Sequence, residues 1–333
     1  MSTPKLVSFF GERSDLFAEL NGKTAAYAKQ KGIAFEWAPQ TPYSVDDVVK
    51  HLNEADAGLI DVEPYGEDIF SRLNGRCRLL IRFGVGFDKV DLPAATKHGL
   101  CVTRTTGANK TGVAEMALMQ ILAARRQLMQ NRKTIASGVW VKNVGNELIG
   151  ARVGILGFGN IGAELTKLLA GFGCEVLAYD TYHDEARAKE LHVRFADLDE
   201  IFTTCDAISV HLPYNAQTHH IIDAAMLAKM KKTAVIVCTA RGNIIDEDAL
   251  YDALSEHRIA GAGLDVYAKE PLPVDSKLIG LDNIILTPHV SSQTCESLWY
   301  TYQKAVDIMA DFFAGKELGR GDLLNPDYRN FVR

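Results

Sequence analysis

The sequence of 333 residues lacks the features that mark a secreted or membrane-spanning protein. Its six cysteines lie far apart in the chain and include no C-x-x-C pair, so no disulfide framework is predicted. No segment reaches the roughly 18 apolar residues of a spanning helix, and no cleavage-like region follows the short apolar run near the first residue. We therefore expect a cytoplasmic protein that is neither exported nor anchored by a helix.

The sequence also lacks an excess of positive charge. Lysine and arginine total 36 against 42 aspartate and glutamate residues, a formal net charge of -6. Because a phosphate backbone or an anionic membrane surface attracts clustered positive charge, we expect neither nucleic acid nor a membrane as a partner. Hydrophobic residues make up 47% and charged residues 23%, which is typical of a folded globular protein. The length predicts about two domains.

Short apolar runs and helical patterns alternate along the N-terminal part of the chain. Helices are predicted near residues 15–31 and 45–54. The apolar runs, which predict strands, are KLVSFF, IAFEWA, AGLIDV and RLLIRFGVG, beginning at residues 5, 33, 57 and 78. Such alternation predicts a parallel sheet that helices cover on both faces.

A second series begins with a long amphipathic segment at about residues 109–136, which predicts a packing helix. Six β-rich runs follow, as in a complete dinucleotide-binding sheet. They are RVGILGFG, EVLAYD, AISVHLP, TAVIVCTA, AGAGLDVY and NIILTPH, beginning at residues 152, 175, 207, 233, 260 and 283. We expect a last helix, at about 295–314, to return to the first domain. The predicted domains are therefore residues 1–101 plus 292–333, and residues 102–291.

A glycine pattern follows the first strand of this second series. Gly157, Gly159 and Gly162 form G-x-G-x-x-G at the start of a helical pattern. In dinucleotide-binding folds such glycines allow a tight turn, close approach of the backbone to a pyrophosphate and close helix-strand packing, and the helix N-terminus donates N–H groups to the anion. The loop predicts a dinucleotide site, while a methyltransferase that binds S-adenosylmethionine stays an alternative.

Asp180 ends the next predicted strand, 23 residues after Gly157. This interval is close to the roughly 20 residues expected for the acid that binds the adenosine ribose. No arginine follows directly to receive a 2′-phosphate, and a carboxylate would repel that group. We therefore expect NAD rather than NADP as the cofactor.

Three downstream segments resemble the NAD-dependent D-isomer-specific 2-hydroxyacid dehydrogenases, the family of D-lactate, phosphoglycerate and glyoxylate/hydroxypyruvate enzymes. They are CTARGNIIDEDAL at 238–250, GAGLDVYAKEPLP at 261–273 and ILTPHVSSQT at 285–294, and RFGVGFDKVDL at 82–92 adds to them. The resemblance covers about residues 77–326. It implies an α/β protein of two doubly wound parallel-sheet domains, a flavodoxin-like substrate-binding domain and a Rossmann NAD-binding domain. The implied activity is interconversion of a D-2-hydroxyacid and a 2-oxoacid by hydride transfer.

The resemblance implies three catalytic residues. His289 matches the family's catalytic histidine, which exchanges a proton, a role that suits a base titrating near neutrality. Glu270 matches the acid that orients this histidine. Arg241 matches the substrate-binding arginine, whose planar fork can grip a carboxylate.

Other matched positions concern cofactor and substrate. Val85 and Gly86 match the turn whose N–H groups receive the substrate carboxylate. The positions implied for the cofactor, besides the three glycines and Asp180, are Asn160, Ile161, Leu212, Pro213, Thr239, Ala240, Arg241 and Asp265. No metal site is predicted, and relatives imply a homodimer with the 109–136 helix as its contact.

The sequence departs from common family patterns at Lys110 and Gly112, and at Trp299 and Tyr300. These residues either border the substrate pocket or, for Trp299, belong to the core. The substrate side chain, the physiological direction and the role of the Trp-Tyr pair therefore stay open. A non-enzymatic NAD(H)-sensing protein of corepressor type is the alternative function.

Overall fold

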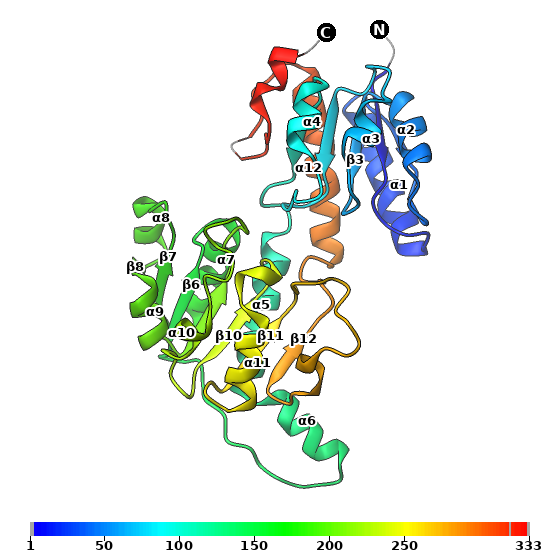
Figure 1. Cartoon of the computed structure of the whole chain (residues 1–333). Coiled ribbons are helices and arrows are strands. Elements are labelled where there is room, and N and C mark those ends of the chain that lie inside the picture. The colour runs from blue at the N-terminus through cyan, green and yellow to red at the C-terminus, as the bar shows by residue number, and fades with distance from the viewer. Residues whose placement is uncertain (1–2, 320, 332–333) are drawn as a thin grey trace. The chain divides into compact units, whose positions relative to one another are not determined.

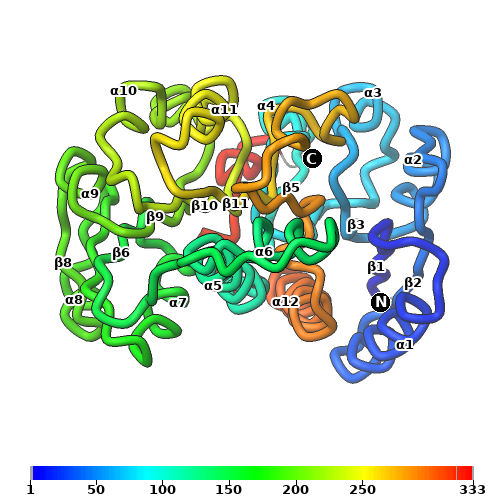
Figure 2. The backbone as a smooth tube through the Cα atoms, turned by 90° about the horizontal axis from the view of Figure 1, so that it is seen from below, coloured from blue at the N-terminus to red at the C-terminus, as the bar shows by residue number. Residues whose placement is uncertain are grey.

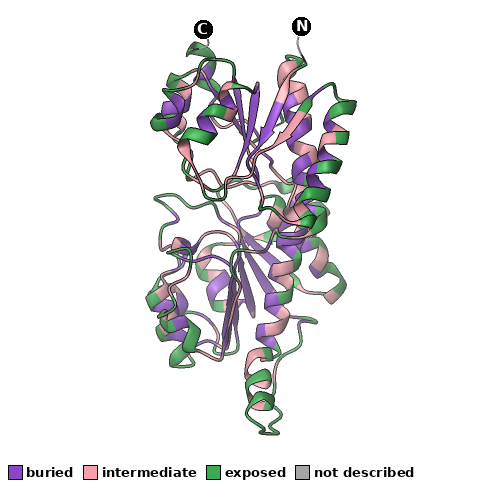
Figure 3. Cartoon of the chain, turned by 90° about the vertical axis from the view of Figure 1, so that its right-hand side faces the viewer, coloured by how far each residue is buried: buried purple, intermediate pink, exposed green. Residues whose placement is uncertain are grey.

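The computed structural model describes residues 3–319 and 321–331 of the chain. The described residues form two compact units. Unit 1 runs to Asn109 and resumes at Cys295, and unit 2 is Lys110–Thr294. In both units the strands are mostly buried, while the outer faces of the helices are exposed (Figure 3).

Unit 1 contains a five-stranded parallel sheet in the order β2-β1-β3-β4-β5. The strands are β1 (Lys5–Ser8), β2 (Ala34–Trp37), β3 (Ala57–Ile60), β4 (Leu79–Arg82) and β5 (Cys101–Arg104). This 2-1-3-4-5 order is that of flavodoxin-like folds. Unit 1 therefore has the predicted fold.

Helices cover both faces of this first sheet (Figure 2). Helices α1 (Asp15–Gln30) and α12 (Cys295–Phe313) share one buried apolar cluster with the sheet. The opposite cluster includes α2 (Val45–Asn53), α3 (Glu67–Phe70) and α4 (Leu92–Lys97). The return of the last helix to the first unit follows from its apolar stripe, which includes the fully buried Tyr302 and Met309.

The fifth strand, β5, corrects the sequence prediction, which placed the domain crossing at residues 101/102. Residues Cys101–Arg104 pair in register with β4 and so belong to the first sheet. The C-terminal segment pairs with the open edge of β5 through an antiparallel bridge between Thr103 and Leu323. A short 3-10 helix, Pro326–Phe331, follows. The crossings lie after Asn109 and Thr294.

Unit 2 contains a seven-stranded parallel sheet in the order β12-β11-β10-β9-β6-β7-β8. The strands are β6 (Arg152–Leu156), β7 (Glu175–Tyr179), β8 (Val193–Phe195), β9 (Ala207–Val210), β10 (Val235–Cys238), β11 (Gly261–Leu264) and β12 (Ile284–Leu286). The strand order reverses between β6 and β9, the place where Rossmann folds bind dinucleotides. Six strands were predicted. The missed one, β8, is a three-residue edge strand with the exposed Arg194 at its centre, so no apolar run marks it.

The helices of unit 2 also form two layers (Figure 2). One buried cluster includes α5 (Lys110–Arg125), α7 (Asn160–Leu169) and α8 (Glu185–Glu190). The other includes α9 (Leu198–Thr204), α10 (Ala224–Leu227) and α11 (Glu247–Ser255). Short 3-10 segments lie at Ala170–Phe172, Gly242–Ile244 and Lys277–Gly280.

The single helix predicted at residues 109–136 is wrong. The chain forms α5 and then a separate helix, α6 (Leu128–Ala136), because Gln127 between them adopts a left-handed conformation with φ 52°. Helix α5 packs into unit 2, whereas α6 contains no buried residue. Helix α6 projects from the rest of unit 2 (Figure 1).

Candidate active site

The glycine loop after β6 fits a dinucleotide. Gly157 has φ +99°, and a Cβ there would lie 2.7 Å from the carbonyl carbon of His211. A Cβ on Gly162 would lie 2.2 Å from the oxygen of Gly157, so this glycine permits close packing of α7 on β6. A Cβ on Gly159 would have no atom within 4 Å, and no side chain caps the N-terminus of α7. The first N–H groups of α7, beginning with Asn160 and Ile161, are thus available to a phosphate.

The carboxylate of Asp180 lies beside this loop at the end of β7. Its Oδ2 accepts a hydrogen bond from the N–H of Phe158 at 2.8 Å, and its Oδ1 accepts one from the N–H of Tyr182 at 3.1 Å. Asp180 therefore supports the loop in addition to its predicted contact with the ribose. Phe158 itself is buried and lies edge to face with Phe195.

A half-buried histidine that the sequence reasoning did not single out lies at the switch point. His211 follows β9, and its ring lies 2.9 Å from the hydroxyl of Ser209 and 3.5 Å from that of Thr239. Burial lowers the pKa of His211 to about 4, so the ring is neutral at neutral pH. Leu212 is buried in the core, whereas Pro213 is exposed. Any contact of Leu212 with a cofactor would therefore be through its backbone.

His289 and Glu270 lie together at the carboxyl ends of the strands, where α/β folds bind ligands. Nδ1 of His289 lies 2.8 Å from Oε2 of Glu270. The other carboxylate oxygen of Glu270 accepts a hydrogen bond from the N–H of Tyr267 at 3.1 Å. The pairing turns Nε2 of the half-exposed His289 ring away from the carboxylate and leaves it for a substrate.

Arg241 is the third predicted catalytic residue, and its positive charge acts electrostatically on Glu270. Burial acts to raise the pKa of Glu270, but the hydrogen bond from His289, the His289 charge, the Tyr267 N–H and the Arg241 charge together lower it. Glu270 is therefore ionised at neutral pH. Arg241 directly precedes the short helix after β10, and its Nη1 donates to the carbonyl of Ala240 at 2.7 Å. Three loops thus place a cation, a carboxylate and an imidazole near one another.

The Asp265 carboxylate accepts hydrogen bonds from several residues of the turn that carries His289. Its side chain is fully buried, and Oδ1 accepts hydrogen bonds from the Thr287 hydroxyl at 2.6 Å and the Val290 N–H at 2.9 Å. Oδ2 accepts from the N–H of Ser291 at 2.8 Å and also from the Ser291 hydroxyl. Sequence reasoning assigned Asp265 to the cofactor and missed this network, because its partners lie more than 20 residues further along the chain.

In unit 1, Val85 and Gly86 lie in the turn after β4. This turn is held by Thr105, whose hydroxyl accepts a hydrogen bond from the N–H of Gly84 at 2.8 Å. Among the described residues, no backbone or side-chain acceptor is bonded to the N–H groups of Val85 and Gly86. No acceptor within the described residues would therefore compete with a ligand for these two N–H groups.

Three of the four residues that depart from the family pattern pack within their own unit or link its helices, and Tyr300 does neither. Trp299 is partly buried between α12 and α1, with its ring edge to face against Tyr27 at 6.1 Å between centroids. Tyr300 is 53% exposed. Nζ of Lys110 lies 2.9 Å from Oε2 of Glu164 and so links α5 to α7, and Gly112 is buried in α5.

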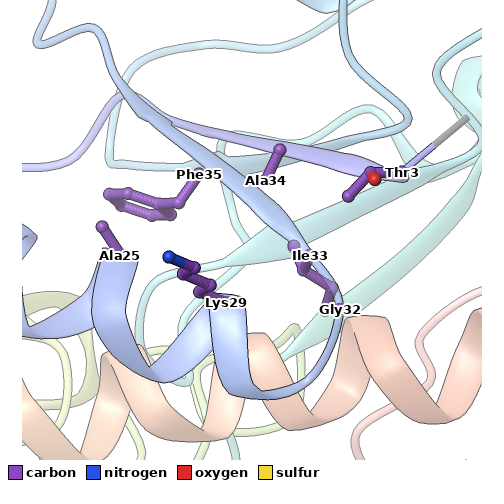
Figure 4. A pocket seen from close by; sticks show the side chains of 7 residues that line it. All are labelled: Thr3, Ala25, Lys29, Gly32, Ile33, Ala34 and Phe35. Carbon is purple, nitrogen blue, oxygen red and sulfur yellow. The ribbon is translucent and has the colours of Figure 1, made fainter.

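A hollow of about 440 Å³ in unit 1 lies away from these residues (Figure 4). Its lining residues are Thr3, Ala25, Lys29, Gly32, Ile33, Ala34 and Phe35. It lies at the amino end of β2, whereas ligands of α/β sheets bind at carboxyl ends. In the part of the chain that the structure describes, no group of three or more His, Cys, Asp or Glu side chains could hold a metal ion.

Comparisons with known proteins agree with this geometry. The family model "D-isomer specific 2-hydroxyacid dehydrogenase, NAD binding domain" matches residues 118–291, and the model of the catalytic domain of the same family matches residues 16–189. The chain belongs to this family.

Individual relatives and solved structures agree with this assignment. A hydroxypyruvate reductase of Thermotoga maritima is 38% identical over 279 residues, 82% of this chain and 88% of the relative. A glyoxylate reductase of Korarchaeum cryptofilum is 34% identical over 269 residues, 78% of this chain and 80% of the relative. The solved structure of a D-2-hydroxyisocaproate dehydrogenase superposes with a TM-score of 0.83 at 26% identity, covering 96% of this chain and 99% of that one.

The family assignment settles the class of reaction. The protein is an NAD-dependent oxidoreductase that interconverts a D-2-hydroxyacid and the corresponding 2-oxoacid. The comparisons lend no support to the alternative of a non-enzymatic corepressor, since the matched relatives are reductases and dehydrogenases. None of the helices in the described residues has the length and apolar character needed to span a membrane.

Proposed function

We propose that His289, Glu270 and Arg241 are the catalytic residues. The observation that carries this assignment is the 2.8 Å contact between His289 Nδ1 and Glu270 Oε2, beside the charge of Arg241. When oxoacid is reduced, His289 gives a proton from Nε2 to the carbonyl oxygen. When hydroxyacid is oxidised, the same nitrogen takes the hydroxyl proton. Glu270 stabilises the imidazolium form electrostatically and fixes the ring orientation.

Arg241 has a binding role in this proposal. Its guanidinium holds the substrate carboxylate through two parallel hydrogen bonds and polarises the adjacent carbonyl. The N–H groups of Val85 and Gly86 are proposed to bind the carboxylate as well. Fixing the substrate in this way orients the reacting carbon, and such alignment can contribute several kcal/mol to catalysis.

The cofactor site is proposed at the glycine loop and the neighbouring strand ends. The N–H groups of Asn160 and Ile161 would hold the pyrophosphate, and Asp180 would accept hydrogen bonds from the ribose hydroxyls. The remaining proposed contacts are Leu212, Pro213, Thr239, Ala240, Arg241 and Asp265. Bound NADH supplies the hydride for reduction, and NAD accepts it in the reverse direction.

Small 2-oxoacids are the proposed substrates. The relatives named above are a hydroxypyruvate reductase and a glyoxylate reductase, which favours these two acids for this chain. Turnover of NADH with a panel of glyoxylate, hydroxypyruvate, pyruvate and branched or aromatic oxoacids tests the proposal. Faster turnover with the small acids than with the bulky ones supports the proposal. If no acid of the panel supports oxidation of NADH, the proposal is wrong.

We further infer that the protein forms a homodimer through α6 and the segment after it. Apolar side chains in this region are exposed, among them Ile135, Trp140 at 81% and Val144 at 86%. Large apolar side chains exposed near one another in the sequence favour an interaction surface here. Sedimentation of the wild type as a dimer and of Trp140→Ser as a smaller species is expected. Monomeric wild type would contradict the inference.

A cytoplasmic location is also proposed. All six cysteines are free, and four of them are buried, as suits a reducing compartment. Fractionation of source cells tests this proposal, and recovery of the protein outside the cytoplasm contradicts it.

A further inference from the structure

Tyr267 lies between the loops that carry Glu270 and His289. It follows β11, and its side chain is only 7% exposed within the larger core cluster of unit 2. The turn after Arg241 also packs directly on it, since a Cβ on Gly242 would lie 1.9 Å from the carbonyl carbon of Tyr267. Tyr267 thus contacts all three loops of the proposed catalytic site.

The hydroxyl of Tyr267 fixes a backbone carbonyl of the His289 turn. It donates a hydrogen bond to the carbonyl oxygen of Thr287 at 2.9 Å, and the carbonyl of Leu264 lies further away at 3.3 Å. The N–H of His289 donates to the same Thr287 oxygen at 3.0 Å. A carbonyl oxygen has two lone pairs and can accept both bonds. Tyr267 therefore stabilises the acceptor that holds the backbone of His289.

This support matters because the backbone of His289 is strained. His289 has φ 53°, in the left-handed region that is unfavourable for a residue with a Cβ. Such a conformation persists only where surrounding contacts enforce it. Asp265 accepts a hydrogen bond from the N–H of Val290, the residue that follows His289 in the chain. Tyr267 donates one to the carbonyl of Thr287, two residues before His289. The two contacts lie on opposite sides of the strained residue.

The backbone of Tyr267 acts on the partner of the histidine. Its N–H donates to Oε1 of Glu270, so one residue is bonded to both sides of the Glu270-His289 pair. Burial raises the pKa of Tyr267 to about 12. The phenol therefore keeps its proton across the working pH range and remains a donor.

We propose that Tyr267 is a positioning residue for this reaction, its hydroxyl setting the His289 turn so that the imidazole meets Glu270. The inference rests on the proposed function of His289 and Glu270. It assigns to the hydroxyl a role separate from the packing of the ring.

The test is the variant Tyr267→Phe in the full-length protein. It keeps the ring and the N–H bond to Glu270 and removes only the contacts of the hydroxyl with the carbonyl oxygens of Thr287 and Leu264. Tyr251→Phe is the matched control, since Tyr251 is a partly buried tyrosine of the same unit whose ring packs on the same core and against Lys277. Turnover with NADH and an accepted oxoacid is measured per NADH-binding site, so that unfolded protein is not counted.

For Tyr267→Phe we expect kcat to fall about three- to tenfold, as the loss of one hydrogen bond at the site predicts, with KM for NADH unchanged. The imidazole N–H resonance of His289, identified by its loss in His289→Gln, should shift or broaden in Tyr267→Phe and not in Tyr251→Phe.

Two outcomes separate the inference from the function on which it rests. If Tyr267→Phe keeps the wild-type kcat and resonance while His289→Gln is inactive, the positioning role is wrong and the proposed function stands. If His289→Gln itself keeps most of its kcat, the proposed function is wrong.

Discussion

Asp265 accepts two hydrogen bonds from Ser291, one from its backbone N–H at 2.8 Å and one from its hydroxyl. Ser291 lies two residues after His289, so this buried contact helps to determine where the turn that carries His289 runs. The carboxylate is well suited to the position because both of its oxygens only accept hydrogen bonds.

Asp265→Asn should therefore destabilise the protein. An amide group would place a donor against buried donors, and leaving such groups unsatisfied costs about 1–3 kcal/mol. Urea unfolding should show a loss of this size, which the exposed control Asp275→Asn should not show. Equal stability of Asp265→Asn and wild type would mean that the network is not important for folding.

Cofactor choice should depend on Asp180. Asp180→Ala should bind NADH more weakly, because the ribose hydroxyls lose a hydrogen-bond acceptor. The difference in kcat/KM between NADH and NADPH should become smaller, because no carboxylate remains to repel the 2′-phosphate of NADPH. The bond to the Phe158 N–H makes Asp180→Asn the informative companion, since asparagine can still hold this N–H. Values of kcat/KM for both coenzymes test this, and an unaltered ratio in both variants contradicts it.

Stability should depend on pH through His211, whose pKa is lowered to about 4 by burial. The unfolded chain binds this proton near the ordinary histidine value of about 6.5. The neutral His211 ring therefore makes its full contribution to the free energy of unfolding above that value. This contribution is lost as the pH falls toward 4. Between pH 7 and pH 5 the free energy of unfolding should fall by about 2 kcal/mol more in the wild type than in His211→Gln. Identical pH dependence in both proteins would show that the His211 ring does not stay neutral in the folded protein.

Much of the candidate site could be predicted because its motifs resemble those of a known family. The resemblance implied the roles of Arg241, Glu270 and His289. They lie near one another, although they span about fifty residues, because the carboxyl ends of parallel strands meet at one edge of the sheet. The Asp265 network and the Tyr267 hydroxyl bond could not be predicted. They depend on the exact course of two loops, which no local pattern in the sequence specifies.

The missed parts of the fold have a similar cause. β5 and β8 contain polar residues, Thr103 and Arg104 in β5 and Arg194 in β8, so no apolar run marks them in the sequence. The break between α5 and α6 depends on the left-handed Gln127, a residue that would ordinarily continue a helix. His211 was overlooked because a histidine after a buried strand has no distinctive spacing.

The pH dependence of turnover should report the charge of Glu270. Its lowered pKa keeps it ionised at neutral pH, so the negative charge favours the imidazolium that reduction requires. Glu270→Gln retains an acceptor and removes the charge. The alkaline limb of kcat/KM for oxoacid reduction should therefore move to lower pH, and the acid limb for hydroxyacid oxidation should move in the same direction. If the pH profiles of Glu270→Gln and of the wild type are superimposable in both directions, Glu270 is not coupled to the proton carrier.

The role of His289 as the proton carrier is tested by the kcat of His289→Gln in oxoacid reduction, measured together with NADH binding by fluorescence on the same sample. The loss of general acid-base catalysis should lower kcat about 10²- to 10⁴-fold, while NADH binds as in the wild type. A variant that binds NADH and retains most of its kcat would contradict the assignment of His289 as the proton carrier.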